Sequence, residues 1–325
     1  MTTPTLLEID DLHLRFRQFE GMSHVLRGLA LRIGRGERVA IVGESGCGKS
    51  VLLRTILGLL DRRNATVEGS IRFQGRELEP DTGQRRDLRG RAITMIFQDP
   101  SSALNPVFTI GDQIVEVIRR HGGIASRAEA LGLARRALQQ VAIDDPDRVL
   151  ASYPFQLSGG LNQRVVITMA LINKPDLVLA DEPGTALDVT IQEQTLRLMR
   201  RLSQESGAAV LLITHNLGVV REFADRVYVM YAGTIVEHAS AKALFASPRH
   251  PYTRALLAAV PRLTGSRPVP IDGMIPDFTR PPPGCRFQPR CAHAVASCLE
   301  PPPMLTVAPG HVVACVLYAG EEARP

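Results

Sequence analysis

The stretch GESGCGKS, residues 43–50, has the residue types and spacing that bind a chain of phosphates. It follows the pattern G-x-x-x-x-G-K-S and lies between an apolar run, RVAIVG, and the helix-like VLLRTILGLL. Glycines let backbone N–H groups surround phosphate oxygens, and the following helix N-terminus adds a positive dipole end. In this pattern Lys49 reaches the β- and γ-phosphates, and the Ser50 hydroxyl holds Mg²⁺. The expected nucleotide-binding residues here are Gly43, Glu44, Ser45, Gly46, Cys47, Gly48, Lys49, Ser50 and Val51.

Two adjacent acids end a second apolar run, LVLADEP. Residues 43–50 form a phosphate-binding loop, or P-loop. Asp181, at the end of a buried strand, can hold Mg²⁺ near Ser50 of this loop. Glu182 beside it can orient or deprotonate an attacking water. An acidic pair alone is more often a solvated strand end, but after a P-loop at this distance the catalytic interpretation is favoured.

The elements that must position these residues alternate between strand and helix. LLEIDDLHLRF has the polar–apolar alternation of a half-buried strand, and RVAIVG, DLVLAD and AAVLLITH are short buried strands. Between about residues 100 and 163 the pattern is helical, with TIGDQIVEVIRRHG and SRAEALGLARRALQQV, the second opening on a capping box from Ser126 to Glu129. Strands alternating with helices predict a parallel sheet wrapped by helices.

Composition narrows the class of protein. The 325 residues carry a formal net charge of +5 and are 45% hydrophobic, enough for a large core or for one domain with an appendage. No apolar run is long enough to span a bilayer, and the N-terminus lacks the features of a secretory signal. We therefore expect a soluble, cytoplasmic protein, in which clustered cysteines favour metal over disulfides. The positive charge is most simply solvated arginine, with nucleic acid or an anionic membrane as alternatives.

QLSGGLNQR, placed between the P-loop and LADEP, resembles the signature motif of ATP-binding-cassette (ABC) ATPases, and the resemblance covers nearly all of the chain. In that family the motif of one subunit completes the ATP site of its partner. The resemblance implies this role for Ser158, Gly159 and Gly160, with Gln163 and Arg164 continuing the motif. A hydroxyl, bare backbone N–H groups and a helix dipole suit a γ-phosphate.

The same resemblance assigns further positions. Gln98 in IFQDP resembles the glutamine that touches Mg²⁺ and water near the membrane subunits. His215 resembles the switch histidine on the γ-phosphate, and Asp188 the loop that communicates across the dimer. Phe16 is placed to stack on adenine, or else is a core residue. The implied catalytic set is Glu182, His215, Gln98 and Lys49, and the implied Mg²⁺ ligands are Ser50, Gln98 and Asp181.

Three residues depart from the family pattern. Gly184 stands where threonine is usual, Asn216 where aspartate is usual, and Asn162 is uncommon in its position. None removes a group assigned to the chemistry, so the departures concern loop rigidity and signalling between subunits.

The C-terminal part resembles the extension of oligopeptide/dipeptide importer ATPases, in SPRHPYTRALLAAVP and GCRFQPRC with its later cysteines. The closest resemblance is to the dipeptide-permease D-type subunit. It implies an ATPase that powers import of a peptide or related solute at the cytoplasmic face of the plasma membrane. The implied partners are a paralogous ATPase, two transmembrane permeases and an extracytoplasmic solute-binding protein, with no nucleic acid. The alternatives are a cytosolic ABC ATPase acting on nucleic acid or ribosomes, and a catalytically inert subunit.

Four of the five cysteines lie in the tail: Cys285, Cys291, Cys298 and Cys315. Their spacings are wider than the usual pairs of zinc sites, and leave a metal site, an iron–sulfur cluster and unliganded thiols open. Resemblance to the importer tails implies a [4Fe–4S] cluster held by all four, with Zn²⁺ as the alternative.

The predicted fold is α/β: a P-loop NTPase (RecA-like) ABC core with an antiparallel β subdomain and an α-helical subdomain, plus a small cysteine-containing C-terminal domain. The expected boundaries are 1–250 for the nucleotide-binding domain, about 100–163 for its helical subdomain, and 251–325 for the extension.

Overall fold

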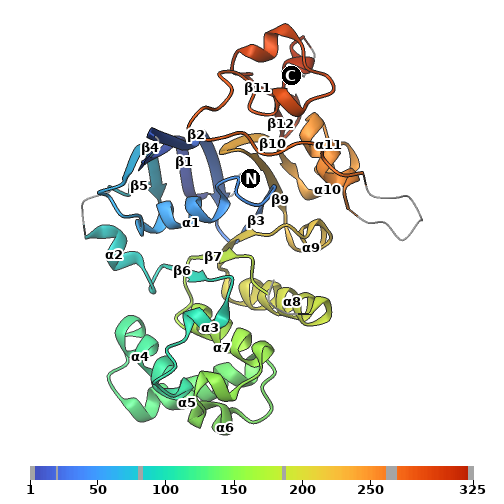
Figure 1. Ribbon diagram of the computed structural model, residues 1–325. Helices are drawn as coiled ribbons and strands as arrows, with labels where there is room; N and C mark the ends of the chain where they lie inside the picture. Colours follow the sequence, from blue (N-terminus) through green and yellow to red (C-terminus); the bar gives the residue numbers. More distant parts are fainter. Residues whose placement is uncertain (1–3, 20, 80–82, 185–187, 261–268, 321–325) are drawn as a thin grey trace. The chain divides into compact units, whose positions relative to one another are not determined.

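The computed structural model describes residues 4–19, 21–79, 83–184, 188–260 and 269–320 (Figure 1). Contacts divide the chain into two compact units. One contains Gly34–Glu37 and Glu79–Leu212, and the other contains Thr5–Ile33, Arg38–Leu78 and the chain from Ile213 onward. The second unit, which holds the P-loop, therefore also holds the described part of the C-terminal tail.

The first sheet of the P-loop unit has the strand order β2-β1-β4-β5. The predicted half-buried strand is confirmed, since Leu12 and Leu14 are buried while their neighbours Asp11, His13 and Arg15 are partly or fully exposed. β4 pairs antiparallel with both β1 and β5. The strands are β1 (Thr5–Gln18), β2 (Gly21–Gly34), β4 (Ala65–Phe73) and β5 (Arg76–Glu77).

A second set of strands in this unit runs in the order β11-β12-β10-β9-β3. β3 and β9 are parallel, whereas β9, β10, β12 and β11 pair antiparallel, so the sheet is mixed where the sequence predicted a parallel one. β11 and β12 both come from the C-terminal tail, and β12 pairs with β10 (Figure 1). The strands are β3 (Arg38–Val42), β9 (Arg226–Tyr231), β10 (Thr234–Ser240), β11 (Met304–Ala308) and β12 (His311–Ala314).

The helices of this unit are short. They are α1 (Lys49–Leu57), α9 (Leu217–Phe223), α10 (Ala241–Ala246) and α11 (Pro251–Ala258), with 3₁₀ turns η2 (Gln288–Arg290), η3 (Ala296–Leu299) and η4 (Val316–Tyr318). α1 confirms the helix predicted after the P-loop.

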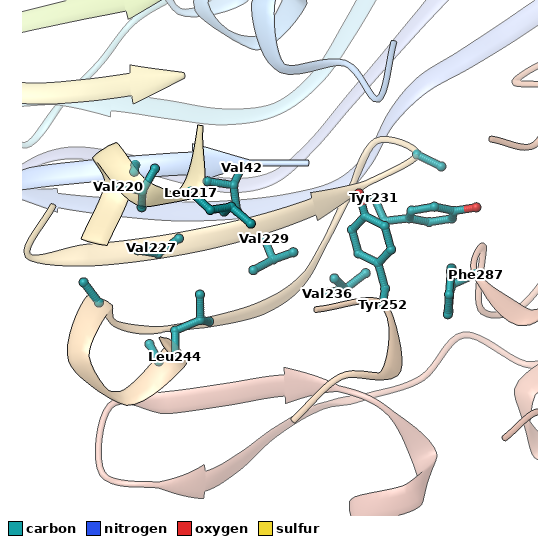
Figure 2. Close-up of a cluster of buried hydrophobic side chains, with 14 residues drawn as sticks. Val42, Leu217, Val220, Val227, Val229, Tyr231, Val236, Leu244, Tyr252 and Phe287 are labelled. Atoms are coloured by element: carbon teal, nitrogen blue, oxygen red, sulfur yellow. The ribbon is translucent and has the colours of Figure 1, made fainter. Parts of the chain in front are cut away.

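One apolar cluster contains residues of both the nucleotide-binding domain (the cassette, up to residue 250) and the C-terminal extension (the tail, from residue 251) (Figure 2). Val42 and Val229 come from β3 and β9, and Tyr252 and Phe287 come from beyond residue 250. The rings of Tyr231, Tyr252 and Phe287 lie 4.6–5.3 Å apart between centroids, in tilted and edge-on arrangements that aromatic pairs favour. The tail thus shares a core with the strands that carry the P-loop.

A buried carboxylate on β10 also bonds to later residues. Glu237 is 0% exposed and accepts hydrogen bonds from the backbone N–H of Arg249 at 2.7 Å and of His250 at 2.8 Å. His311 Nε2, at the start of β12, lies 2.7 Å from the same carboxylate. A buried acid is tolerated only when paired and hydrogen-bonded, and every partner here follows residue 248.

The other unit contains the strands β8-β7-β6 and a group of helices. Ser126 caps α5 by accepting from the Glu129 N–H at 3.3 Å, as the capping pattern predicted. α7 packs against α3, α4, α5 and α8, and α4 packs against α5 and α6. The strands are β6 (Ile93–Ile96), β7 (Leu177–Asp181) and β8 (Ala209–Ile213). The helices are α2 (Gln84–Leu88), α3 (Pro100–Ala103), α4 (Ile110–Gly122), α5 (Arg127–Gln140), α6 (Pro146–Ala151), η1 (Pro154–Gln156), α7 (Gly159–Leu171) and α8 (Val189–Ser206).

Replacing Glu237 with alanine tests the bonds between β10 and the tail. Glu237→Ala leaves three buried donors without an acceptor, so we expect the free energy of unfolding to fall by about 3 kcal/mol. Denaturant unfolding followed by circular dichroism measures the change. The matched control is Glu300→Ala, because Glu300 is an exposed acid of the same tail. Equal, small changes in both variants would contradict the assigned role of Glu237.

Candidate active site

The P-loop connects β3 to α1 with a backbone that requires glycine. Gly43, Gly46 and Gly48 have φ of 157°, 80° and 105°, values that other residues rarely adopt. A Cβ on Gly43 would lie 2.1 Å from the carbonyl oxygen of Met230 on β9. Only glycine therefore fits at position 43, where the loop packs directly against β9.

Lys49 points into the loop. Its side chain is almost fully buried, and Nζ donates to the carbonyl oxygens of Gly43 and Glu44, each at 2.8 Å. Cys47 Sγ is 3.7 Å from the same ammonium, and burial raises the pKa of this thiol. Cys47 therefore stays a neutral, small residue within the loop. Ser50 and Val51 follow in the first turn of α1.

Glu44 makes contacts that the sequence did not reveal. Its N–H donates to the hydroxyl of Tyr252 at 2.9 Å, and its carboxylate accepts from Arg290 Nη1 at 3.1 Å to each oxygen. Both partners lie more than 200 residues away in sequence. No local pattern could have signalled either contact, because only the fold brings α11 and η2 to the P-loop.

His215 and Phe16 also belong to the P-loop unit. His215 is exposed just after the buried Thr214. The next residue, Asn216, caps α9 by accepting from the Val219 N–H at 3.3 Å, so it performs the capping role that aspartate would fill. Phe16 is half-buried on β1 and is paired with Ala65 of β4. Its stacking on adenine remains a prediction.

The acidic pair and Gln98 lie at one sheet edge in the other unit. β6 and β7 are parallel, with Ile96 opposite Ala180, so their carboxyl ends meet. Gln98 follows β6, Asp181 ends β7 and Glu182 follows it. Asp181 is 6% exposed, whereas Gln98 is exposed and Glu182 is half-buried with a left-handed φ of 46°. The three oxygen-bearing residues therefore come from the same edge of the sheet.

The departure at position 184 has a backbone cause. Gly184 has φ of 97°, and a Cβ there would lie 3.3 Å from Gln192 Cγ on α8. A threonine in this conformation would be strained. Glycine at position 184 therefore suits the backbone conformation that the chain adopts after Asp181 and Glu182.

The signature residues lie at an exposed helix start in the same unit. Ser158 caps α7, a helix of 13 residues, by accepting from the Leu161 N–H at 3.4 Å. Ser158 and Gly159 are exposed, and Gly160 is partly so. Asp188 caps α8 in the same way and is also exposed. The start of α7 is therefore exposed at Ser158 and Gly159.

The four tail cysteines surround one cavity of about 10 Å³, together with His250, Phe287 and His293. Burial raises the pKa of the Cys285 and Cys291 thiols, and that of Cys315 to about 11. Without a cation these groups are neutral thiols. Among the described residues, no group of three or more His, Cys, Asp or Glu side chains is arranged to hold a metal ion. The tail therefore gathers four sulfur donors without placing them in ligating geometry.

Comparison with known proteins decides the family. The ABC transporter family model matches residues 26–185, and the model for the oligopeptide/dipeptide transporter C-terminal region matches 236–298. The dipeptide transport ATP-binding protein DppD of Bacillus subtilis is 46% identical over 320 residues, covering 96% of this chain and 94% of its own. This chain is an ABC transporter ATPase of the oligopeptide/dipeptide type. The resemblance drawn from the motifs is thereby confirmed.

Other relatives of this ABC ATPase agree. A protein of Sinorhizobium fredii described as "Probable peptide ABC transporter ATP-binding protein y4tR" is 50% identical over 316 residues, covering 95% of this chain and 94% of its own. The oligopeptide transport ATP-binding protein OppD of Mycobacterium tuberculosis is 47% identical over 317 residues, which are 96% of this chain and 52% of that protein.

Solved structures confirm the ABC fold with mixed sheets. The dimeric ATP-binding cassette MJ0796 bound to ADP and Pi has a TM-score of 0.64 at 29% identity, over 73% of this chain and 99% of its own. The ABC ATPase binds ATP with Mg²⁺ and hydrolyses it for transport. Within the part of the chain that the structure describes, no helix is long and apolar enough to cross a membrane.

Gly43→Ala tests the close approach at the P-loop. The added methyl group must displace the loop from the Met230 carbonyl, so we expect ATP affinity to fall by about tenfold or more. Binding of a fluorescent ATP analogue to the full-length chain measures it. Gly83→Ala is the control, because nothing lies within 4 Å of a Cβ at that position. Unchanged binding in Gly43→Ala would contradict this account of the loop.

Proposed function

We propose that this ATPase powers the import of a peptide or related small solute, from the cytoplasmic face of the plasma membrane. The observation that carries the proposal is similarity across both parts of the chain. Relatives named for dipeptide, oligopeptide and peptide transport match over 95% or more of it, and the C-terminal model of such transporters matches 236–298. The proposed partners are a paralogous ATPase, two transmembrane permeases and an extracytoplasmic solute-binding protein.

The proposed ATP site is composite. The P-loop of one subunit would hold the triphosphate, while Ser158, Gly159 and Gly160 would meet the ATP bound by the partner ATPase. The exposed start of α7 supports this role, because its hydroxyl and N–H groups have room for a γ-phosphate. The MJ0796 cassette, which shares the fold, is described as dimeric.

In the proposed mechanism, the residues mainly position the phosphates and the attacking water and neutralise negative charge. Lys49 would exchange its bonds to Gly43 and Glu44 for phosphate oxygens, since an anionic acceptor is stronger than a carbonyl. Ser50, Gln98 and Asp181 offer the oxygens that Mg²⁺ prefers, and Mg²⁺ supplies charge neutralisation at the phosphates. Glu182 would orient the attacking water and accept its proton, and His215 would contact the γ-phosphate.

The amide variant of Glu182 tests the hydrolytic step. Glu182→Gln keeps the shape of the side chain but cannot accept the proton, so we expect kcat to fall by about 100- to 10,000-fold while ATP affinity is retained. Phosphate release and nucleotide binding, measured on the same preparation, separate the two effects. Glu193→Gln, at an exposed acid on α8, is the matched control.

The partners provide a second check on the same proposal. The chain should co-purify with membrane permeases, and its ATPase activity should rise with the solute-loaded binding protein. Activity that rises with DNA or ribosomes, in a protein that does not associate with permeases, would contradict the importer. Hydrolysis unaffected in Glu182→Gln would remove that residue from the mechanism.

We further propose that Cys285, Cys291, Cys298 and Cys315 hold a [4Fe–4S] cluster, with Zn²⁺ as the alternative occupant. Support comes from the four cysteines that line one cavity, because both occupants are bound by cysteine sulfur; ligation would require these side chains to move into ligating geometry. Binding of either occupant would release protons, because ligating cysteines are thiolates. The chemistry of the group at this site would be structural, organising a segment rich in proline.

Anaerobic purification tests the occupant. We expect a brown protein with about four irons and matching sulfide per chain, and Cys291→Ser should lose them. Cys47→Ser is the internal control, since Cys47 lies in the P-loop and should not affect iron content. Stoichiometric zinc in a colourless preparation would identify the alternative, and an anaerobic preparation free of both metals would exclude ligation.

A further inference from the structure

Every polar group of Glu44 is bonded. Its N–H donates to Tyr252 at 2.9 Å, its carbonyl accepts from Lys49 Nζ at 2.8 Å, and its carboxylate accepts from Arg290. Glu44 is the second residue of the P-loop, so these bonds fix the loop close to where it begins. Two of the three come from residues beyond position 250.

Arg290 is built into its place. Its side chain is 6% exposed, and Nη1 also donates to the Tyr231 hydroxyl at 3.2 Å. Nε donates to the carbonyl of Asp272 at 2.7 Å and Nη2 to that of Ile271 at 3.2 Å. The guanidinium is held from several directions and is not a mobile surface charge.

The charge of this pair matters for an anionic ligand. Glu44 places a carboxylate in a loop whose expected ligand is a triphosphate, and like charges at short range repel. Arg290 compensates that carboxylate at 3.1 Å. Removing the arginine would both release the Glu44 side chain and leave its negative charge beside the phosphates.

We propose that Arg290 is a positioning residue for the P-loop, through which the C-terminal segment sets the affinity for nucleotide. The inference rests on the proposed role of the P-loop in ATP binding. Arg290 touches no reacting atom, and it acts through Glu44. Its neighbour Cys291 lines the four-cysteine cavity, so a change in that site lies one peptide bond from the Arg290–Glu44 pair.

A structural role alone predicts something different. If Arg290 only fastened the tail, its removal would lower the unfolding temperature and leave the KM for ATP unchanged. A positioning role predicts a raised KM with little change in kcat, because the affected group binds phosphate and does not activate water. The change in KM on removing the Glu44 carboxylate distinguishes the positioning role from the structural role further, because removing that carboxylate removes the repulsion of the phosphates.

The experiment measures KM, kcat and thermal unfolding for the full-length ATPase and a set of variants. We expect Arg290→Ala to raise KM by about tenfold, within the range usual for coupled sites. Arg290→Lys should give a smaller rise, because lysine keeps the charge but loses the planar donor fork. Glu44→Gln should lower KM, because the variant removes the negative charge beside the phosphates, and adding it to Arg290→Ala should recover part of the loss. Arg280→Ala, at an exposed arginine of the same tail, should match the wild type.

Each outcome decides the question. An unchanged KM in Arg290→Ala with a lowered unfolding temperature would reduce Arg290 to a structural role. A Glu44→Gln loss as large as that of Arg290→Ala, with no recovery in the double variant, would overturn the charge argument. If Arg290→Ala does not fold, Arg290→Lys and Glu44→Gln carry the test. Lys49→Ala distinguishes the underlying proposal, because nucleotide binding unaffected by that change would mean that the P-loop role itself is wrong.

Discussion

Close packing of the P-loop against the end of β9 and the turn between β9 and β10 is the constraint on which the ATP site depends. The Met230 carbonyl leaves no room for a side chain at Gly43, and the Gly233 N–H donates to the carbonyl of Cys47 at 2.8 Å. Gly233 itself has φ of 82° and faces the Val25 carbonyl with no space for a Cβ. The loop is thus shaped by the strands around it as much as by its own glycines, and its backbone N–H groups are oriented before any phosphate arrives.

The C-terminal tail also contacts the strands that support the P-loop. Arg286 is buried beside Cys285, and its guanidinium donates to the carbonyl oxygens of Ala232 and His24, while burial lowers its pKa to about 10. Arg27 on β2 in turn donates to the carbonyl of Gly284 at 2.7 Å. Arginines on both sides therefore fasten the first cysteine segment to the strands that support the P-loop. Separate family models match the cassette and the C-terminal region. In the structure, however, the C-terminal region is bonded to the strands of the cassette.

Local patterns were sufficient for the parts of the site that lie within one stretch of chain. The P-loop, the acidic pair after β7 and the Ser158 cap of α7 follow from residue type and spacing, because each is a strand end or helix start with its own signal. The contacts of Tyr252 and Arg290 with Glu44 could not be predicted, since neither residue has a local feature that indicates its partner. The tail strands were missed because β11 and β12 are short and are stabilised only by pairing with β10.

Glu237 has a consequence for how the chain is made. All the described donors to its carboxylate are synthesised after the strand that carries it, and His311 follows Glu237 by 74 residues. Until then, β10 has a charged group that cannot be buried at low cost, and one edge that still lacks its neighbour β12. The P-loop unit is therefore expected to close only after β12 has been translated, so a ribosome that stalls before this point presents an incomplete cassette to chaperones and proteases.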